Sequence, residues 1–255
     1  MRADATFEDL FAFGSAADTT GWDFSWLDGR ATEERPPWGY ARLLAGRLAE
    51  ATASLDLQTG GGEVLAEAPR FPPIAVATEA WPPNVARATR LLHPRGVTVV
   101  ADTDEPPLPF ASDTFDLVSS RHPATIWWGE IARVLQPGGT YLAQHIGAAS
   151  AFELIEFFLG PQPEARKLRD VGAETAEAQA AGLEIIDVQT ARLRIELHDV
   201  AAVVYLLRKV IWWVPDFSVE RYRDRLRELH ERITRTGPFV AHSTRQLIEA
   251  RKPAR

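Results

Sequence analysis

The chain has 255 residues, of which 45% are hydrophobic, and its formal net charge is −7 at pH 7. This length and composition indicate a globular protein with one large core and exclude a disordered or fibrous chain. The acidic balance argues against nucleic acid as a partner, because no excess of cations is available to neutralise a phosphate backbone. The lack of cysteine in the sequence excludes disulfides, thiolate zinc sites and cysteine nucleophiles.

Neither the first residues nor any apolar window of the sequence indicates a membrane or a secretory route. The first ten residues lack the basic and apolar regions of a signal peptide, and no window approaches the roughly 20 apolar residues that span a bilayer. The longest apolar stretch, 200–214, is interrupted by Arg208 and Lys209. We therefore expect a soluble, cytoplasmic protein with no membrane partner, and the sequence leaves its oligomeric state unknown.

Short apolar runs alternate with helical patterns in the first half of the chain. Parallel strands joined by right-handed crossovers are expected from this alternation, with helices on both faces of an open sheet. The segment Pro137-Gly138-Gly139 is expected to separate a helix from the strand after it. The predicted strands are 54–58, 74–78, 97–101, 115–119 and 140–145, and the predicted helices are 83–92 and 125–135.

The second half of the chain departs from this regular alternation. A long strand is expected at 183–197 and a closing strand near 246–250. The amphipathic pattern of 218–235 is interpreted as a helix that packs on the core. The predicted helices are 152–159, 163–181, 200–211 and 218–235.

A glycine turn is the strongest local signal in the sequence. The strand that contains Asp56 runs into the three glycines 60–62 and then into a helical start. Glycine is needed where the backbone turns sharply and lies against a ligand. Glu79 closes the next strand, 23 residues after Asp56, where a doubly wound nucleotide site places the acid that binds ribose hydroxyls.

A nicotinamide dehydrogenase shares this arrangement and is the first alternative. Its G-x-G-x-x-G fingerprint requires a final glycine for helix packing, where this chain has Leu65. Glu63 at the start of the helix would repel a pyrophosphate. A cofactor without phosphates and with a cationic centre is therefore favoured.

Three motifs resemble one known family. The run from Asp56 to Gly62 resembles the D-x-G-x-G-x-G first motif of class I S-adenosylmethionine-dependent methyltransferases of the type 11-like group. The segments 108–110 and 115–118 are similar to the LPF and FDLV region of that family, and 133–140 is similar to its R-x-L-K-P-G-G turn. The resemblance covers about 55–145 and implies S-adenosyl-L-methionine as the cofactor.

The resemblance implies roles for the matching residues only. Glu79 would bind the ribose hydroxyls, and Asp102, or Asp104 in its place, would bind the adenine amino group. Gln58 stands where the motif has its first glycine, so it either narrows the approach to the cofactor or hydrogen-bonds it. The residues expected at the methionine end of the cofactor are Asp56, Gly60 and Gly62.

The amino-terminal segment is rich in aromatic residues. In the family this segment often covers the cofactor, and an aromatic face would attract a sulfonium through cation–π interaction. We therefore expect residues 1–53 to form a helical lid and Tyr40 to contact the cofactor. The alternative is that these rings pack a helix onto the sheet. The aromatic residues concerned are Trp22, Phe24, Trp26, Trp38 and Tyr40.

Catalysis is expected just after the fourth strand, where Arg121 and His122 follow one another. Methyl transfer from a sulfonium needs a nucleophile held in line and, where required, a base that removes its proton. His122 is the candidate general base and Arg121 the candidate group for an anionic substrate. The alternative is that both cap the strand. His145 and His198 are interpreted as structural, and the sequence shows no metal-binding spacing.

We predict a single methyltransferase domain over 1–255, with a cofactor-binding core at 54–147 and a substrate cover with strands at 148–255. Its fold is expected to be α/β, a Rossmann-like doubly wound seven-stranded sheet, mostly parallel with an antiparallel last strand and a helical insertion before that strand. The expected function is methyl transfer to a small-molecule acceptor. The alternatives are an RNA- or protein-directed methyltransferase and a non-catalytic methyltransferase-like binding protein.

Overall fold

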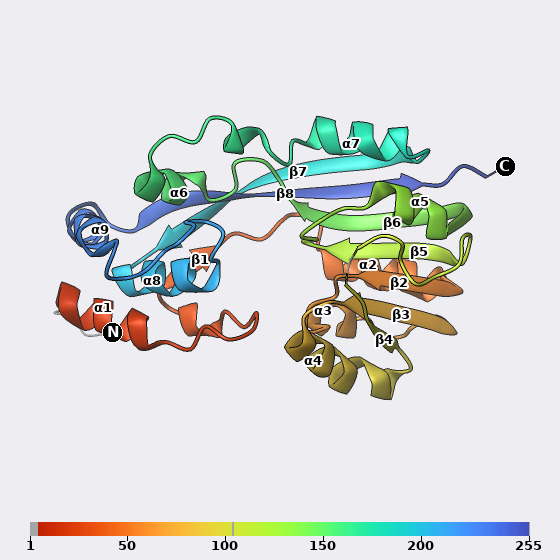
Figure 1. Ribbon diagram of the computed structural model, residues 1–255, viewed down its shortest axis with the longest axis horizontal. Helices are drawn as coiled ribbons and strands as arrows, with labels where there is room; N and C mark the ends of the chain where they lie inside the picture. The colour runs from red at the N-terminus through yellow and green to blue at the C-terminus, as the bar shows by residue number, and fades with distance from the viewer. Residues whose placement is uncertain (1–4, 104, 255) are drawn as a thin grey trace. The chain divides into compact units, whose positions relative to one another are not determined.

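The computed structural model describes residues 5–103 and 105–254 (Figure 1). Its contacts divide the chain into two compact units that alternate along the sequence. Unit 1 is Met1–Arg35, Ala149–Leu168 and Arg192–Thr244, and unit 2 is Pro36–Ala148, Arg169–Ala191 and Arg245–Arg255. The predicted lid, core and cover do not follow these boundaries, because the segment before residue 54 contributes to both units.

Unit 2 contains the predicted parallel strands and the helices predicted at 83–92 and 125–135, whereas the helix predicted at 163–181 forms only over its second half. Its helices are α2 (Tyr40–Glu50), α3 (Glu63–Ala66), α4 (Pro82–Leu92), α5 (Trp128–Val134) and α7 (Val171–Ala180). Its strands are β2 (Ala53–Leu57), β3 (Ile74–Glu79), β4 (Thr98–Ala101), β5 (Phe115–Arg121) and β6 (Leu135–Ile146).

Unit 1 is mainly helical. It contains α1 (Phe7–Ala16), β1 (Ala31–Glu33), α6 (Phe152–Leu159), α8 (Val200–Lys209) and α9 (Arg223–Thr236). Two long strands, β7 (Glu184–Leu197) and β8 (Phe239–Arg251), have residues in both units. Three short turns of 3-10 helix lie at Ser25–Leu27, His93–Arg95 and Ala165–Lys167.

The strands form one sheet in the order β1-β7-β8-β6-β5-β2-β3-β4. The pairs β2–β3, β2–β5, β3–β4 and β5–β6 are parallel, whereas β6–β8 and β1–β7 are antiparallel. The mostly parallel Rossmann-like sheet and its antiparallel last strand are therefore confirmed. The sheet has eight strands and not seven, because β1, with only three residues, is too short to give an alternating pattern.

Two strands begin several residues before their predicted positions. β6 begins at Leu135, so Pro137-Gly138-Gly139 lies inside the strand and does not precede it. Leu135 pairs with Phe115, and the register between β5 and β6 shifts just after this pair. The glycines therefore mark an irregularity in a continuous strand. β8 begins at Phe239, before the predicted closing strand near 246.

Each face of the sheet in unit 2 is covered by its own core. Tyr141 belongs to the cluster that packs under α5, and its neighbour Leu142 belongs to the cluster under α2 and α4. Successive residues of a strand point to opposite faces, so the two clusters lie on opposite sides of the sheet. Helices therefore cover both faces, as the sequence predicts.

The core of unit 1 is built around α8. Nine of its ten residues are buried, and a helix that is buried all round belongs at the centre of its unit. Asp199 caps its first turn by accepting a hydrogen bond from the N–H of Ala202 at 2.9 Å. The same carboxylate forms a 2.6 Å ion pair with Arg30. Within the described residues, no helix is both long enough and apolar enough to cross a membrane.

Candidate functional site

Three acidic residues lie at or near the carboxyl ends of neighbouring parallel strands in unit 2. Asp56 is the penultimate residue of β2, Glu79 is the last residue of β3, and Asp102 directly follows β4. In the register of the sheet, Asp56 pairs with Ala77 and Glu79 pairs with Ala101. The structure thus brings together three of the predicted cofactor residues at the edge where doubly wound sheets bind ligands.

Glu79 fastens the glycine turn to the end of β3. Its buried carboxylate accepts hydrogen bonds from the backbone N–H of Gly60 at 2.7 Å and of Trp81 at 3.0 Å. Gly60 has φ 64°, and a Cβ placed on it would meet no atom within 4 Å, so this part of the turn faces open space. A Cβ on Gly62, at φ 83°, would lie 2.8 Å from Leu92 of α4. Gly60 therefore leaves room for a ligand, whereas Gly62 lets the turn pack on α4.

Asp102 carries an unused acceptor beside this turn. Its Oδ2 atom is buried and has no hydrogen-bond partner among the residues that the structure describes. Its backbone N–H donates to the carbonyl oxygen of Glu79 at 3.1 Å, which fixes Asp102 next to that residue. A buried, unpaired carboxylate oxygen is costly, so this atom is suited to accept a hydrogen bond from a ligand. The alternative residue, Asp104, lies outside the described residues.

Asp56 is buried in the sheet, and the pKa of its carboxyl group is raised. Burial raises the pKa of its carboxyl group to about 6, and the Ser119 hydroxyl, which donates to Oδ1 at 2.6 Å, opposes this shift. A carboxyl group in this state gains from a neighbouring cation, because an opposite charge favours the ionised form. Asp56 is therefore suited to a positively charged part of a ligand.

Gln58 uses its side chain to hold the loop at 122–127, which we call the post-β5 loop. Its Oε1 accepts a hydrogen bond from the N–H of Ala124 at 2.7 Å, and its Nε2 donates to the carbonyl of Thr125 at 2.8 Å. Arg169 donates to the carbonyl oxygens of Pro123 and Ala124 at 3.3 and 3.1 Å. Gln58 also has φ 55°, a region that favours glycine. The side chain that replaces the first motif glycine thus holds the post-β5 loop by two hydrogen bonds.

His122 is held in one tautomer by Gln144. The Oε1 of Gln144 accepts from the indole N–H of Trp38 at 2.8 Å, so its Nε2 is the donor to Nε2 of His122 at 2.9 Å. The proton of the neutral ring is then on Nδ1. Burial, and next the cation of Arg121, hold the pKa of His122 well below its usual range. The ring is therefore neutral near neutral pH, while Arg121 ends β5 at the surface.

The aromatic residues of the predicted lid are divided between the two units. Tyr40 is buried and donates its hydroxyl to the carbonyl of Ser120 at 3.0 Å, and burial raises its pKa well above the usual range. Trp26, in unit 1, stacks on Tyr205 with ring centroids 4.6 Å apart. Trp22 and Phe24 are exposed. Tyr40 and Trp26 thus make packing contacts, and the contact of Tyr40 with the cofactor stays a prediction.

A chain of buried polar side chains on the α5 face of the sheet was not predicted. Nδ1 of His145 lies 2.8 Å from Glu174, and its Nε2 lies 3.0 Å from the hydroxyl of Tyr141. Tyr141 and His145 are four residues apart on β6, so period two puts them on one face. That spacing was visible in the sequence, but Glu174 comes from α7 and only the fold brings it near. No group of three acidic or histidine side chains suited to a metal occurs in the described parts of the chain.

The doubly wound sheet, its glycine turn and the acids at its carboxyl edge define a nucleotide-binding α/β protein. Residues 55–143 match the family model of the methyltransferase domain. This segment therefore matches a methyltransferase domain, and S-adenosylmethionine is the cofactor of the class that its motifs resemble. The resemblance predicted from the motifs is confirmed over this segment. No curated protein matches the chain.

Solved structures share the fold. YcgJ protein from Bacillus subtilis is 20% identical with a TM-score of 0.60, and the match covers 85% of this chain and 99% of that one. Phosphoethanolamine N-methyltransferase 2 of Haemonchus contortus, solved with S-adenosylhomocysteine, is 17% identical with a TM-score of 0.51, over 98% of this chain and 60% of that one. The cyclase SpnF is 19% identical with a TM-score of 0.54, over 84% and 80%.

The residues at the carboxyl edge fit S-adenosylmethionine. The open space at Gly60, the carboxylate of Glu79 and the unpartnered Oδ2 of Asp102 lie on successive strands, and an adenosine group presents hydroxyls and an amino group to such acceptors. Asp56 supplies a third acidic group at this edge. The fit rests on these side chains and on the turn that Glu79 holds.

Proposed function

We propose that the protein transfers a methyl group from S-adenosylmethionine to a small-molecule acceptor at the carboxyl edge of unit 2. The observation that carries the proposal is the buried Oδ2 of Asp102, which has no partner among the described residues and lies beside Glu79. An unsatisfied acceptor of this kind is expected at a place where a ligand supplies the donor.

Each acid has a separate task in the proposed site. Glu79 would hold the ribose hydroxyls, Asp102 would accept from the adenine amino group, and Asp56 would pair with the ammonium at the methionine end. When bound, S-adenosylmethionine supplies a methyl carbon made electrophilic by the adjacent sulfonium. The chain then has to hold the acceptor atom in line with that carbon, and orientation of this kind supplies much of the rate.

Arg121 and His122 are proposed to orient the acceptor. With Nε2 bonded to Gln144, His122 offers the Nδ1 proton, so we assign it the role of a hydrogen-bond donor in place of a general base. Arg121, at the exposed end of β5, would attract an anionic group on the acceptor. In both roles the side chain positions the acceptor, whereas the cofactor is bound by the three acidic residues.

The choice of a small-molecule acceptor is supported by the pocket under the post-β5 loop. Apolar side chains from Leu57, Leu108, Ile126, Trp127 and Ile131 contribute to its lining. Its cavity volume is about 10 Å³, close to that of a single water molecule. A larger acceptor would therefore enter as the loop moves, and the apolar lining favours an apolar or aromatic body.

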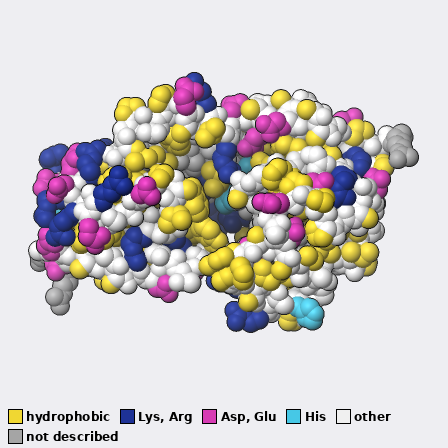
Figure 2. Space-filling view, in the orientation of Figure 1, with side chains coloured by type: hydrophobic (Ala, Val, Ile, Leu, Met, Phe, Trp, Pro, Cys, Tyr) yellow, Lys and Arg dark blue, Asp and Glu magenta, His cyan; other side chains and the backbone are white. Residues whose placement is uncertain are grey.

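Three alternatives remain. An RNA-directed enzyme needs a continuous basic surface, whereas Figure 2 shows arginine and acidic side chains interspersed over α9, where Arg227 pairs with Glu8. A protein-directed enzyme would share every cofactor residue. A binding protein that does not transfer methyl groups would also bind the cofactor; SpnF, a cyclase with this fold, illustrates that the fold alone does not define the reaction.

Calorimetry and a methyl-transfer assay test the proposal together. We expect S-adenosylmethionine to bind the full chain, and tritiated methyl groups to pass to a small-molecule cell extract but not to purified RNA or protein from the same cells. Failure of the intact protein to bind S-adenosylmethionine would refute the cofactor assignment. Binding with no transfer to any of the three pools would favour the non-catalytic alternative.

A further inference from the structure

Three buried side chains of unit 2 form a continuous polar chain that the cofactor site does not use. Tyr141 and His145 come from β6 and are fully buried, and Glu174 comes from α7 and is 7% exposed. The distances are 3.0 Å from the Tyr141 hydroxyl to Nε2 of His145 and 2.8 Å from Nδ1 of His145 to Glu174. Burying a carboxylate and an imidazole costs free energy unless they are paired, so their position needs an account.

The directions of these hydrogen bonds follow from the groups involved. An ionised Glu174 only accepts hydrogen bonds, so Nδ1 of a neutral His145 carries the ring proton and Nε2 is the acceptor. The Tyr141 hydroxyl then donates to Nε2. Burial raises the pKa of Tyr141 far above its usual value, so the resting phenol keeps its proton. The Tyr141 oxygen still has a lone pair that can accept a further hydrogen bond.

Tyr141 also lines the pocket under the post-β5 loop. Two other polar side chains of that lining already donate to backbone carbonyls: Ser120 to Leu57 at 3.0 Å and Gln58 to Thr125 at 2.8 Å. Trp128 packs edge-on against Tyr141 with ring centroids 5.4 Å apart, which fixes the phenol ring in place. The pocket therefore has an apolar wall, and one of its lining residues, Tyr141, is connected through its hydroxyl to His145 and a buried acid.

We propose that Tyr141 is the catalytic residue that accepts the proton of an apolar alcohol or phenol, with His145 and Glu174 as its positioning residues. The inference rests on the proposed function, because it specifies the acceptor class of that same site. It also supplies the base that His122, with Nε2 bonded to Gln144, does not provide.

The proton and electron balance is complete within these groups. As the acceptor oxygen forms its bond to the methyl carbon, the carbon–sulfur bond breaks and its electron pair stays on sulfur. The hydroxyl proton of the acceptor moves to the Tyr141 oxygen, while the Tyr141 proton moves to Nε2 of His145. The products are a methyl ether, a neutral thioether and an imidazolium that faces the Glu174 carboxylate.

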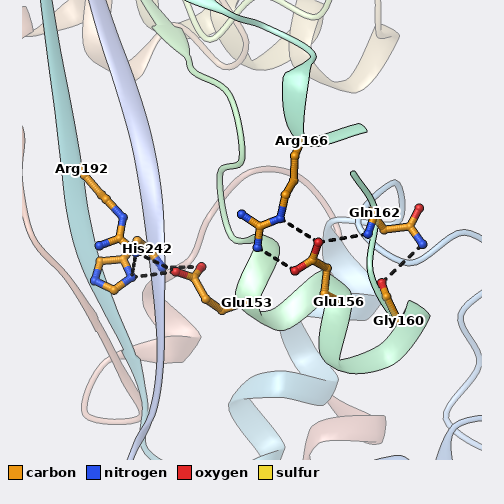
Figure 3. A network of polar contacts seen from close by, with 7 residues as sticks. All are labelled: Glu153, Glu156, Gly160, Gln162, Arg166, Arg192 and His242. Carbon is orange, nitrogen blue, oxygen red and sulfur yellow. Dashed lines mark hydrogen bonds and ion pairs between the residues drawn. The ribbon is translucent and has the colours of Figure 1, made fainter. Parts of the chain in front are cut away.

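A second histidine–carboxylate pair in the chain provides a matched control. In unit 1, Nδ1 of His242 lies 2.9 Å from Glu153, and Arg192 also binds Glu153 at 2.9 Å (Figure 3). This pair is partly exposed, with side-chain exposures of 24% for His242 and 33% for Glu153. Its ring signals should not respond to a ligand in the pocket of unit 2.

Nitrogen NMR of ring-labelled histidines in the full chain, without cofactor, tests the connection directly. Phenol is the probe, and toluene, which has the same ring without the hydroxyl, is its control. We expect phenol to shift the Nε2 signal of His145 and to leave the His242 signals unchanged, while toluene shifts neither. In Tyr141→Phe, which keeps the ring, the phenol-dependent shift should disappear, and in Glu174→Gln the proton on Nδ1 should be less strongly hydrogen-bonded.

The hydrogen bonds from the Gln58 side chain hold the post-β5 loop over the pocket, so the same titration is run on Gln58→Ala. Lack of a His145 response to phenol in both the wild type and Gln58→Ala would overturn the proposal. A phenol shift that persists in Tyr141→Phe would also overturn it. These readouts do not involve S-adenosylmethionine, whose binding is measured separately, so failure of the relay and failure of the methyltransferase proposal are distinguishable.

Kinetics provide a second readout once an alcohol or phenol acceptor is turned over. Tyr141→Phe should lower kcat about a hundredfold, the loss typical of a missing proton-transfer group, with little change in the cofactor Kd. Glu174→Gln should lower kcat less. An equal effect of Tyr141→Phe and His242→Ala on kcat would indicate a structural role alone and overturn the assignment.

Discussion

The carboxylate of Glu79 accepts a hydrogen bond from the backbone N–H of Gly60 at 2.7 Å. This bond ties the glycine turn after β2 to the end of β3, so the turn has its shape without a ligand. A carboxylate has about four lone-pair positions, and the bonds from Gly60 and Trp81 use two of them. Glu79 can therefore shape the turn and bind ribose hydroxyls at the same time.

The first prediction follows from this double role. Glu79→Ala should weaken S-adenosylmethionine binding about tenfold or more, because hydrogen bonds to a charged group are each worth about 1.5 kcal/mol or more. Glu79→Gln is the matched control, since its amide keeps the size but offers one acceptor atom. It should give an intermediate Kd by calorimetry. Equal affinity of the wild type and Glu79→Ala would contradict the assignment.

Cofactor affinity should also depend on pH through Asp56. Burial raises the pKa of this carboxyl group to about 6, so the free protein carries it largely protonated below that value. If its ionised form binds the cofactor ammonium, affinity is fully present above about pH 6 and falls up to about tenfold for each pH unit below it. Calorimetry across this range should show a flat profile in Asp56→Asn. A wild-type profile as flat as that of the variant would refute the pairing.

The same raised pKa predicts an effect on stability. Because the folded pKa is above the unfolded value of 3.8, the native state binds more protons, and its stability falls as pH rises from about 4 to about 6. Asp56→Asn should remove this dependence and stabilise the protein most at neutral pH. Urea unfolding at several pH values measures the slope. A stability profile of Asp56→Asn parallel to that of the wild type would show that Asp56 does not titrate in this way.

Gln58 should control the mobility of the post-β5 loop. Gln58→Gly removes both hydrogen bonds from the side-chain amide to the loop. It also relieves the strain of a left-handed backbone conformation at this position, so global stability should change by less than about 1 kcal/mol. Hydrogen exchange at the N–H of Ala124, which bonds to Gln58, should become faster by about tenfold. Unchanged exchange at Ala124 in the variant would show that Arg169 alone holds the loop.

Unit 1 should depend strongly on Asp199. Asp199→Ala leaves Arg30 without its 2.6 Å partner and removes the cap of α8, and loss of one member of a buried pair costs about 3–5 kcal/mol. Asp199→Asn keeps a side-chain acceptor for the cap and should cost less. Urea unfolding compares the three proteins. A loss below about 1 kcal/mol in Asp199→Ala would mean that the pair behaves as an exposed one.

The residues that we propose for the cofactor could be picked out from the sequence because their signals are local. The turn at Gly60, the acid Glu79 and the strand before each are short patterns of residues adjacent in the chain. The position of Asp102 follows from the end of the next strand. The parallel sheet was predictable for the same reason, since each strand and its crossover helix form one continuous stretch.

The remaining features depend on contacts between distant residues. Gln58 was expected at the cofactor, but its amide binds Thr125, and only the fold brings that loop to it. The tautomer of His122 depends on Gln144, which in turn depends on Trp38. β1 escaped prediction because three residues carry no periodic pattern. These residues are far apart in the chain, and the local sequence around one residue does not indicate its partner.

The place of β8 beside β6 has a consequence for how the protein is made. β6 is complete at Ile146, but its antiparallel neighbour is supplied by residues 245–251. During translation, about a hundred further residues leave the ribosome before this edge of the growing sheet can be covered. An open strand edge invites pairing with other chains, so the nascent protein should depend on chaperones during that interval.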